Sequence, residues 1–299
     1  MVRDGSPPTE QWALDLRFLA IDLETTGLNP YKHEIIEIGA VAFNIEGLGD
    51  EFSVLIRPER KMDPKARAIH QISAAEIEEK AVSLADGLAA FQKFMPEGSW
   101  VFHNAPFDLS FLKQSFTAVK APWLNRSYYD HLQLSRKLRS ERISHSLDAI
   151  KKELGIDTGQ AHRALADARA TALAFIHLLQ TEPDIFASKT RFQKIRRWQR
   201  KTEKFEILFP KNFDQIEQYF QGKIRQEAML KVDFFDKNGY PQRALVQPLE
   251  VMIFSHNIYI RSRIHPGGQD ILIPLQRATI HDQELGAINF VQQSGLTNQ

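Results

Sequence analysis

Two carboxylates stand close together where a strand pattern gives them little reason to be. Asp22 lies inside the apolar run of residues 18–23, although aspartate is depleted from strand interiors. Side chains alternate along a strand, so Asp22 and Glu24 project from the same face. Neighbouring carboxylates on a partly buried surface repel each other and are costly to desolvate. A hard divalent cation such as Mg²⁺ or Mn²⁺ offsets both the repulsion and the desolvation cost, because it prefers oxygen ligands and binds the carboxylates.

Three further residues carry the same kind of chemistry. Asp108 ends the segment VFHNAPFD, and His162 and Asp167 lie in the segment HRALADARAT. A histidine, with an unperturbed pKa of about 6.5, suits a general base near neutral pH. The spacing of five residues does not put His162 and Asp167 on one helical face. We therefore expect His162 on a loop or first turn, with Asp167 projecting from the helix that follows.

Each of these residues alone has an ordinary structural alternative. Asp22 could cap a turn, Glu24 could pair with a surface lysine, and Asp108 could neutralise a helix N-terminus. Asp167 could belong to a solvated helix face, and His162 could be a helix-start histidine. The joint pattern, with each element in its expected local structure, favours a metal-dependent catalytic site.

The five residues in this order resemble the DnaQ-like 3′–5′ exonucleases, and more narrowly the branch with four acidic residues and a histidine, called DEDDh. The resemblance covers residues 16–179. It includes ETTGL after the first acidic pair, HNAPFD, the closing H-x-x-x-x-D-A, and AIHQIS at residues 68–73, similar to an element of DNA polymerase III epsilon-type proteins. Gln71 replaces the glycine of that element, a departure that bears on substrate contacts and not on metal binding.

The resemblance implies an RNase H-like fold and hydrolysis of a phosphodiester with two Mg²⁺ or Mn²⁺ ions. The implied metal ligands are Asp22, Glu24, Asp108 and Asp167, and the catalytic set adds His162 as the general base. In this scheme Asp22 bridges both ions, and Asp108 acts directly or through bound water. The expected substrate contacts near the 3′ end are Thr25, Thr26, Gly27, Leu28, His103, Asn104 and Phe107. His103 and Asn104 could instead fix loop geometry, and Gly27 suits a close approach of backbone to ligand.

The segments that must position these residues alternate between strand and helix patterns. Strands are expected at residues 16–23, 34–43, 51–56, 100–103 and 128–130, with the second and third forming a hairpin. Helices are expected after a Ser73 cap and at residues 84–94, 107–116, 146–154 and 164–179. Three antiparallel strands followed by this alternation fit an α/β fold, a mixed sheet with helices on its faces. His145 is expected to be structural.

A basic stretch follows at residues 189–204. It carries eight Lys or Arg side chains and one acidic residue, interleaved with Phe192 and Trp198. One interpretation is a solvated basic helix that joins two domains. The other is a nucleic-acid contact, in which cations bind phosphates and aromatic rings stack on bases.

The pattern of predicted secondary structure changes again beyond about residue 212. A helix is expected at residues 213–227, followed by short strands at 231–235, 244–246, 251–254, 258–264 and 271–275. Turn signals separate them, among them Asn238-Gly239. The segment resembles a WYL domain, although Ile258 replaces that family's tryptophan and puts a ligand-binding role in doubt. We therefore expect an exonuclease domain at 12–185, a basic linker at 186–211 and a small β-rich domain at 212–299.

Composition sets the remaining limits. The 299 residues suggest two domains, with one large domain as the alternative, and the 43% of hydrophobic residues can fill a core. No apolar run approaches the ~20 residues that cross a bilayer, and the first residues lack the apolar core of a secretory signal. The absence of cysteine excludes disulfides and fits a cytoplasmic protein. Net charge is only +1, so local basic patches would have to attract a polyanion.

Together these features predict a metal-dependent 3′–5′ exonuclease that releases nucleoside 5′-monophosphates from single-stranded ends, with DNA favoured over RNA by the resemblance. The alternatives are an exoribonuclease of the same fold, or a regulatory protein whose C-terminal domain senses a ligand or nucleic acid. A protein partner or ligand of that domain also stays open. An intact acidic set argues against a purely non-catalytic role.

Overall fold

The chain forms two compact units, Met1–Ile207 and Leu208–Gln299. The computed structural model describes residues 16–160, 162–181, 195–207, 213–235, 239–254, 257–283 and 285–288. All residues predicted to be catalytic lie in the first unit. The expected domain limits at 12–185, 186–211 and 212–299 stay a prediction.

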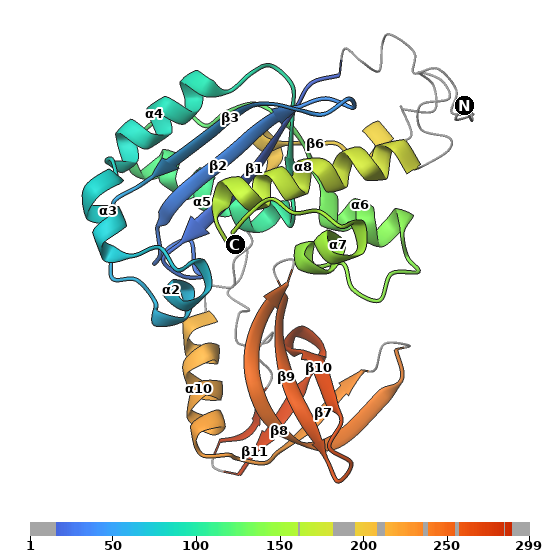
Figure 1. The fold of residues 1–299 in the computed structure, drawn as a ribbon. Helices are drawn as coiled ribbons and strands as arrows, with labels where there is room; N and C mark the ends of the chain where they lie inside the picture. Colours follow the sequence, from blue (N-terminus) through green and yellow to red (C-terminus); the bar gives the residue numbers. More distant parts are fainter. Residues whose placement is uncertain are drawn as a thin grey trace. The chain divides into compact units, whose positions relative to one another are not determined.

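A six-stranded mixed sheet runs through the first unit (Figure 1), in the order β3-β2-β1-β4-β5-β6. The strands are β1 (Phe18–Thr25), β2 (Ile35–Phe43), β3 (Leu48–Leu55), β4 (Ser99–Phe102), β5 (Ser127–Asp130) and β6 (Arg200–Lys201). The first three strands are antiparallel neighbours, β4 runs parallel to β1, and β5 runs parallel to β4. The predicted α/β architecture and its hairpin are confirmed.

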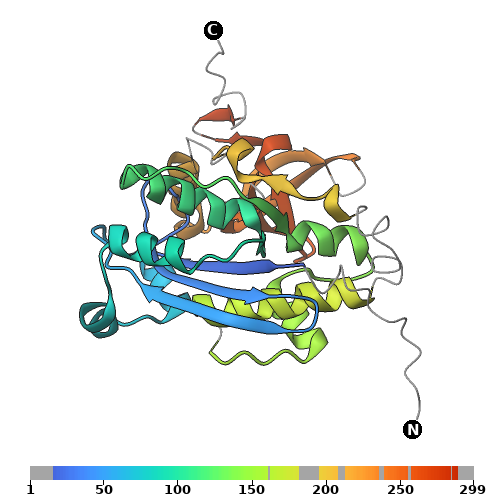
Figure 2. The same cartoon turned by 90° about the horizontal axis from the view of Figure 1, so that it is seen from above.

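Helices cover both faces of this sheet (Figure 2). They are α2 (Pro64–His70), α3 (Ala74–Lys80), α4 (Leu84–Phe94), α5 (Ala105–Ala118), α6 (His131–Leu138), α7 (Leu147–Leu154) and α8 (Ala164–Thr181). Side-chain alternation along β1 divides the core. Phe18 and Ala20 belong to the cluster that contains Phe175 of α8, whereas Leu19 and Ile21 pack with residues of α4 and α5 on the other face.

Local capping explains where most of the predicted helices begin and end. The hydroxyls of Ser73, Ser83 and Ser146 accept hydrogen bonds from the backbone N–H three residues later. Gly155 ends α7 in the left-handed conformation, with φ 64°. The helices α2 and α6 were not predicted, because neither is long enough to show a clear helical period. The side chain of Asp130 caps α6 by accepting from the Gln133 N–H at 3.2 Å.

The described part of the basic stretch contacts the sheet and the core of the first unit. Arg200 and Lys201 form β6, which pairs with β5 at the edge of the sheet. Ile195 and Phe205 are buried in the core of the first unit. These contacts tie residues 195–207 to the first unit, whereas the preceding residues 182–194 lie outside the described residues.

The second unit contains one α-helix, one short 3-10 helix (Leu275–Arg277) and one antiparallel sheet among its described residues (Figure 1). The helix is α10 (Phe213–Arg225), and the strands are β7 (Leu230–Phe235), β8 (Pro241–Phe254), β9 (Asn257–His265), β10 (Asp270–Pro274), β11 (Thr279–Asp282) and β12 (Gly286–Ile288). Their order is β10-β9-β8-β7-β11-β12. Two predicted strands, 244–246 and 251–254, are one long strand, β8, with an irregular register between Pro248 and Glu250.

The β-rich character predicted for this unit is confirmed, whereas the WYL resemblance stays a prediction. The proposed Asn-Gly turn lies partly outside the described residues. Among the helices that the structure describes, none has the length and apolar character that a membrane crossing requires.

Candidate active site

Three carboxylates meet where β1 ends and α8 begins. Because Phe18 and Ala20 pack on the α8 side of the sheet, the alternation along β1 also turns Asp22 and Glu24 to that side. Asp167 lies in the first turn of α8. Asp22, Glu24 and Asp167 each offer a carboxylate oxygen, and these oxygens lie within 4.8 Å of one another. The fold therefore joins two predicted segments that are far apart in the sequence.

Gly39 on β2 allows α8 to start this close to the sheet. It pairs with Asp22 across the β1–β2 ladder. A Cβ atom at Gly39 would lie 2.1 Å from the carbonyl carbon of Ala164, which a side chain cannot tolerate. Gly39 is not among the predicted site residues, although a glycine inside a strand pattern often signals a close backbone approach.

Glu37 on β2 anchors the start of α8 and is also not among the predicted site residues. Its side chain is buried and pairs with Arg163, whose Nε and Nη atoms donate to it at 2.9–3.3 Å. The backbone N–H of Ala164 donates to the same carboxylate at 2.9 Å. Arg163 also bonds Glu76 of α3 at 3.0 Å. Glu37 is thus occupied as an anchor, and its position in the apolar strand IIEIGAVAF is the signal that would have found it.

Asp108 lies beside the three carboxylates, in the first turn of α5. It is buried, and burial is the main cause that raises its pKa well above the usual range. Hydrogen bonds from backbone groups, including Leu23, act in the opposite direction. The charge of Asp108 in turn raises the pKa of Asp22, which places the two side chains in electrostatic contact.

Burial and mutual repulsion dominate the electrostatics of the site. Burial is the largest cause that raises the pKa of Asp22 well above 3.8, followed by the charges of Asp108, Glu24 and Asp167. Burial and the Asp167 charge raise the pKa of Glu24 to about 8, while Arg163 lowers it. These carboxylates are therefore not stabilised as anions by the protein alone.

The residues present fit a divalent cation. Three carboxylate oxygens from β1 and α8 converge, all are hard donors, and none comes from a flexible surface loop. A cation would stabilise the charged forms that burial disfavours. Asp22, Glu24 and Asp167 are the residues that would hold it, with Asp108 next to them.

Asp167 already has two partners in the protein. Its Oδ2 accepts a hydrogen bond from the backbone N–H of His162 at 3.1 Å. Its Oδ1 lies 3.3 Å from Nζ of Lys151 on α7, and both side chains are largely buried. The structure thus places His162 on the loop before α8, as predicted, with φ 59° and a half-buried side chain. Lys151 is a cation beside the site that sequence analysis did not single out.

His103 and Asn104 turn inward, which favours the loop-fixing alternative. Nδ1 of His103 lies 3.0 Å from Nδ1 of His131. Burial lowers the pKa of His103 to about 4 and that of His131 well below 6.5, so both rings are neutral near neutral pH. Asn104 takes the left-handed conformation with φ 74° at the start of α5. The expected structural role of His145 agrees with its 2.9 Å bond to the Ser135 hydroxyl.

The ETTGL segment divides into internal and exposed residues. Thr25 Oγ1 donates to Gly27 O at 2.8 Å, and Thr26 is fully buried, with its N–H donating to Glu34 O. A Cβ at Gly27 would meet the His33 ring at 2.4 Å, so this glycine accommodates a side chain of the protein rather than a ligand. Leu28 is 48% exposed. Of the predicted substrate contacts, Leu28 is exposed and Phe107, His103 and Asn104 are half-buried, whereas Thr25, Thr26 and Gly27 are buried.

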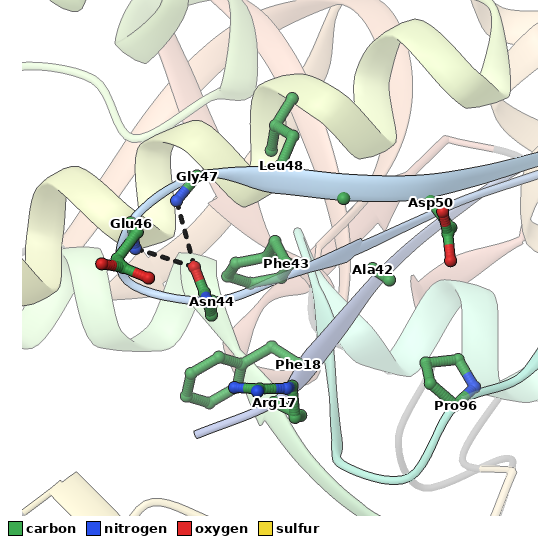
Figure 3. Close-up of a pocket in the computed structure, with 11 residues that line it drawn as sticks. Arg17, Phe18, Ala42, Phe43, Asn44, Glu46, Gly47, Leu48, Asp50 and Pro96 are labelled. Atoms are coloured by element: carbon green, nitrogen blue, oxygen red, sulfur yellow. Dashed lines mark hydrogen bonds between the residues drawn. The ribbon is translucent and has the colours of Figure 1, made fainter. Parts of the chain in front are cut away.

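A separate hollow of about 510 Å³ lies at the other end of β1 (Figure 3). Arg17, Phe18 and the β2–β3 hairpin line it, and Asn44 Oδ1 accepts there from the N–H groups of Glu46 and Gly47. None of the predicted site residues lines this hollow. Phe18 and Asp22 are four residues apart, about 13 Å along a strand, so the hollow is not the carboxylate site.

Comparison with known proteins agrees with this geometry. The family described as exonuclease matches residues 19–175. DNA polymerase III of the PolC type from Thermotoga maritima is 38% identical over 175 residues, which cover 58% of this chain and 13% of that protein. The PolC-type polymerase III of Staphylococcus epidermidis is 29% identical over 184 residues, 60% of this chain and 13% of that protein. The chain thus spans about an eighth of the length of these relatives.

Among solved structures, Escherichia coli exonuclease I in complex with a dT13 oligonucleotide has a TM-score of 0.52 and 20% identity. The match covers 83% of this chain and 55% of that one. This likeness concerns the fold, which is RNase H-like in the first unit. Its share of the chain exceeds the first unit, so it extends into the second.

Proposed function

The chain belongs to the exonuclease family, as a DnaQ-like 3′–5′ exonuclease of the DEDDh type, and from this we propose that it degrades single-stranded DNA from its 3′ end. The proposed products are nucleoside 5′-monophosphates. The observation that carries the proposal is the convergence of Asp22, Glu24 and Asp167 within the family's matched region. DNA is preferred to RNA on similarity to the PolC-type polymerases, which are named for DNA synthesis.

In the proposed mechanism, water attacks the terminal phosphodiester and the bond from phosphorus to the 3′ oxygen breaks. Two divalent ions, Mg²⁺ or Mn²⁺, held by Asp22, Glu24 and Asp167 with Asp108 beside them, would supply charge neutralisation at the phosphate. His162 takes the proton of the attacking water on an imidazole nitrogen. The shortened strand leaves with a 3′ hydroxyl. Leu28 and Phe107 pack against the terminal nucleotide.

The position of His162 supports its role as a base. The loop before α8 holds its backbone against Asp167, which ties the histidine to a carboxylate of the site. Its side chain is half-buried, so it stays accessible to water. Arg163, the next residue, anchors the loop on Glu37, and among the described residues the His162 imidazole has no hydrogen-bond partner.

One assay tests the proposal. The purified chain is incubated with 5′-labelled single-stranded DNA or RNA of equal length and with Mg²⁺ or Mn²⁺, and the products are sized over time. A ladder that shortens one nucleotide at a time, faster with DNA and absent with a chelator, is expected. Internal cuts, shortening from the 5′ end, or no metal dependence would overturn the proposal, and faster loss of RNA would reassign the substrate to RNA.

A further inference from the structure

We propose that an exposed basic edge of the first unit binds the phosphates of the single strand on the 5′ side of the nucleotide being removed. The basic edge consists of Arg196, Arg197, Arg200, Lys201 and Lys204. This inference rests on the proposed function, since it assigns a track for the same substrate. It also decides between the two interpretations of the basic stretch, in favour of a nucleic-acid contact.

The basic edge is a fixed part of the first unit. β6 pairs with β5 through Ser127–Lys201 and Tyr128–Arg200. Thr202 is fully buried, and its hydroxyl accepts from the Arg126 N–H at 2.8 Å and donates to Leu124 O. The indole N–H of Trp123 donates to Thr202 O at 2.8 Å. The cations therefore project from an anchored backbone, and ordering them on a ligand costs less conformational entropy than ordering a free linker would.

Among the described residues, no carboxylate forms an ion pair with the cations of the basic edge, although the charge of Arg200 acts to lower the pKa of the buried Asp130. Elsewhere Arg57 pairs with Glu78, Arg142 with Glu153 and Arg169 with Glu51. All five side chains of the basic edge are exposed, and none forms an ion pair with a carboxylate among the described residues. Arg200 bonds the Tyr128 hydroxyl instead. Such unpaired, closely spaced cations are the complement of a chain of phosphates.

An aromatic ring adds a feature that fits nucleic acid better than other polyanions. The guanidinium of Arg197 lies 5.8 Å from the centre of the Trp198 ring. Trp198 is half-buried and packs against the core cluster of Phe18 and Phe175. Guanidinium and indole planes both stack on bases without regard to sequence. The basic edge thus offers phosphate and base contacts side by side.

The sheet topology sets how long a strand must be to reach the basic edge. β6 lies three strands from β1 in the order β1-β4-β5-β6. At about 4.8 Å for each strand spacing, this is about 14 Å sideways from β1. Arg200 is level with Leu19 through Tyr128 and Trp100, and Asp22 lies three residues, about 10 Å, further along β1. The separation is therefore about 17 Å, and at about 3.4 Å for each nucleotide of a stacked strand about five nucleotides lie between the two contacts. Substrates of three nucleotides should be too short to contact the basic edge, whereas substrates much longer than this should contact it.

The test compares two variants of the full chain that lose the same charge. The first is Arg196→Gln/Arg197→Gln/Lys201→Gln, and the matched control is Lys80→Gln/Lys93→Gln/Lys120→Gln, three exposed lysines of the first unit. Binding of a fluorescent twenty-nucleotide oligothymidylate is measured by anisotropy in EDTA at several salt concentrations. Hydrolysis of oligothymidylates of three and twenty nucleotides is measured with Mg²⁺.

For the basic-edge variant we expect binding of the long strand to weaken at least tenfold relative to the control. Its salt slope should become shallower by about two, because each phosphate contact on a single strand contributes about 0.7. KM for the long substrate should rise while kcat for it and all constants for the trinucleotide stay unchanged. Affinity and salt slope equal to those of the control would overturn the inference. So would a polyglutamate peptide that displaces the oligonucleotide at equal charge concentration.

The two proposals fail in different ways. If the wild-type chain hydrolyses neither substrate, the proposed function fails. If it hydrolyses both and the two variants bind alike, only the basic-edge inference fails.

Discussion

A cluster of acidic residues in the first unit contrasts with two paired acidic residues in the second. In the second unit Asp233 bonds Arg243 and His281, and Asp270 bonds Arg261 and Arg263. These partners lower the pKa of both carboxyls. In the first unit burial and mutual repulsion raise the pKa of Asp22, Glu24 and Asp108.

The difference separates carboxylates that stabilise the fold from carboxylates whose negative charge needs a bound cation. A surface carboxylate matched by arginine contributes modestly to stability and needs nothing further. Buried carboxylates without enough cations cost stability, and a protein keeps them where they have a task. Asp282, buried in the second unit, shows that burial alone does not decide this, because Lys223 and Tyr219 satisfy it at 2.7 and 2.6 Å.

The largest expected effect is the loss of activity on removing a carboxylate of the first unit. Asp22→Ala and Asp167→Ala should each abolish metal-dependent hydrolysis, because the cation loses the arrangement that holds it. Asp270→Asn in the second unit is the control and should keep wild-type turnover. Turnover is measured on labelled single-stranded DNA with Mg²⁺, and circular dichroism checks the fold. Wild-type rates in either alanine variant would contradict the site assignment.

Next in size is the change His162→Ala. Loss of a general base slows chemistry by about 10²–10⁴-fold. Metal affinity should change little, since His162 approaches Asp167 through its backbone N–H. Isothermal titration with Mn²⁺ and single-turnover rates together test this. A collapse of metal affinity along with the rate would make His162 a ligand rather than the base.

Glu37 should matter through the helix that it anchors. Glu37→Gln removes the charge that pairs with Arg163 and weakens the bond to the Ala164 N–H. We expect activity to fall by about tenfold to a hundredfold, the usual range for residues that orient a metal-binding group. Glu51→Gln, which breaks the exposed pair with Arg169, is the matched control and should leave kcat unchanged. Equal kcat values for the two variants would show that the α8 start does not depend on Glu37.

The sequence predicted the fold of the first unit well because its signals are local. The alternation around Asp22, the serine caps and Gly155 each act within a few residues, and the corresponding elements form as expected. Contacts between residues far apart in the sequence were not predicted. Gly39 and Glu37 position α8 across more than a hundred residues of sequence, and the edge strand β6 forms only because β5 offers a partner.

The candidate site shows the same limit. The acidic residues were visible in the sequence because a carboxylate in an apolar strand or beside an alanine-rich helix is conspicuous. Lys151 was not, since one lysine on an amphipathic helix resembles any other until the fold places it 3.3 Å from Asp167. The sequence pattern predicts Thr26 and Gly27 as substrate contacts, and in the structure Thr26 bonds the Glu34 N–H and Gly27 lies against the His33 ring.

Lys151 offers a smaller test on the first unit. It neutralises Asp167 without metal, so it competes with a cation for that carboxylate. Lys151→Gln should tighten Mn²⁺ binding at least about fivefold, because this largely buried pair competes with the cation by at least the ~1 kcal/mol of an exposed pair. Lys152→Gln, at the next position of α7 and exposed, is the control. Calorimetric titration of both variants decides it, and weaker binding in Lys151→Gln would mean that the lysine organises the site instead of competing.

The smallest expected effect is a pH dependence of stability, measured in EDTA, for which Glu24 and Asp233 are expected to act with opposite sign. The pKa of Glu24 is about 8 in the folded chain against 4.5 ordinarily, so the folded state holds a proton that the unfolded state releases between these values. Stability of the first unit should therefore fall as pH rises from about 4.5 to about 8. The pKa of Asp233 is lowered, so the stability that its ion pairs contribute is present above the usual pKa of 3.8 and is lost only in stronger acid.

All four tryptophans lie in the first unit, so their fluorescence during urea unfolding reports the stability of that unit alone. Glu24→Gln should flatten the decline and Asp233→Asn should leave it intact, whereas an equal decline in the Glu24→Gln variant would remove Glu24 as its source.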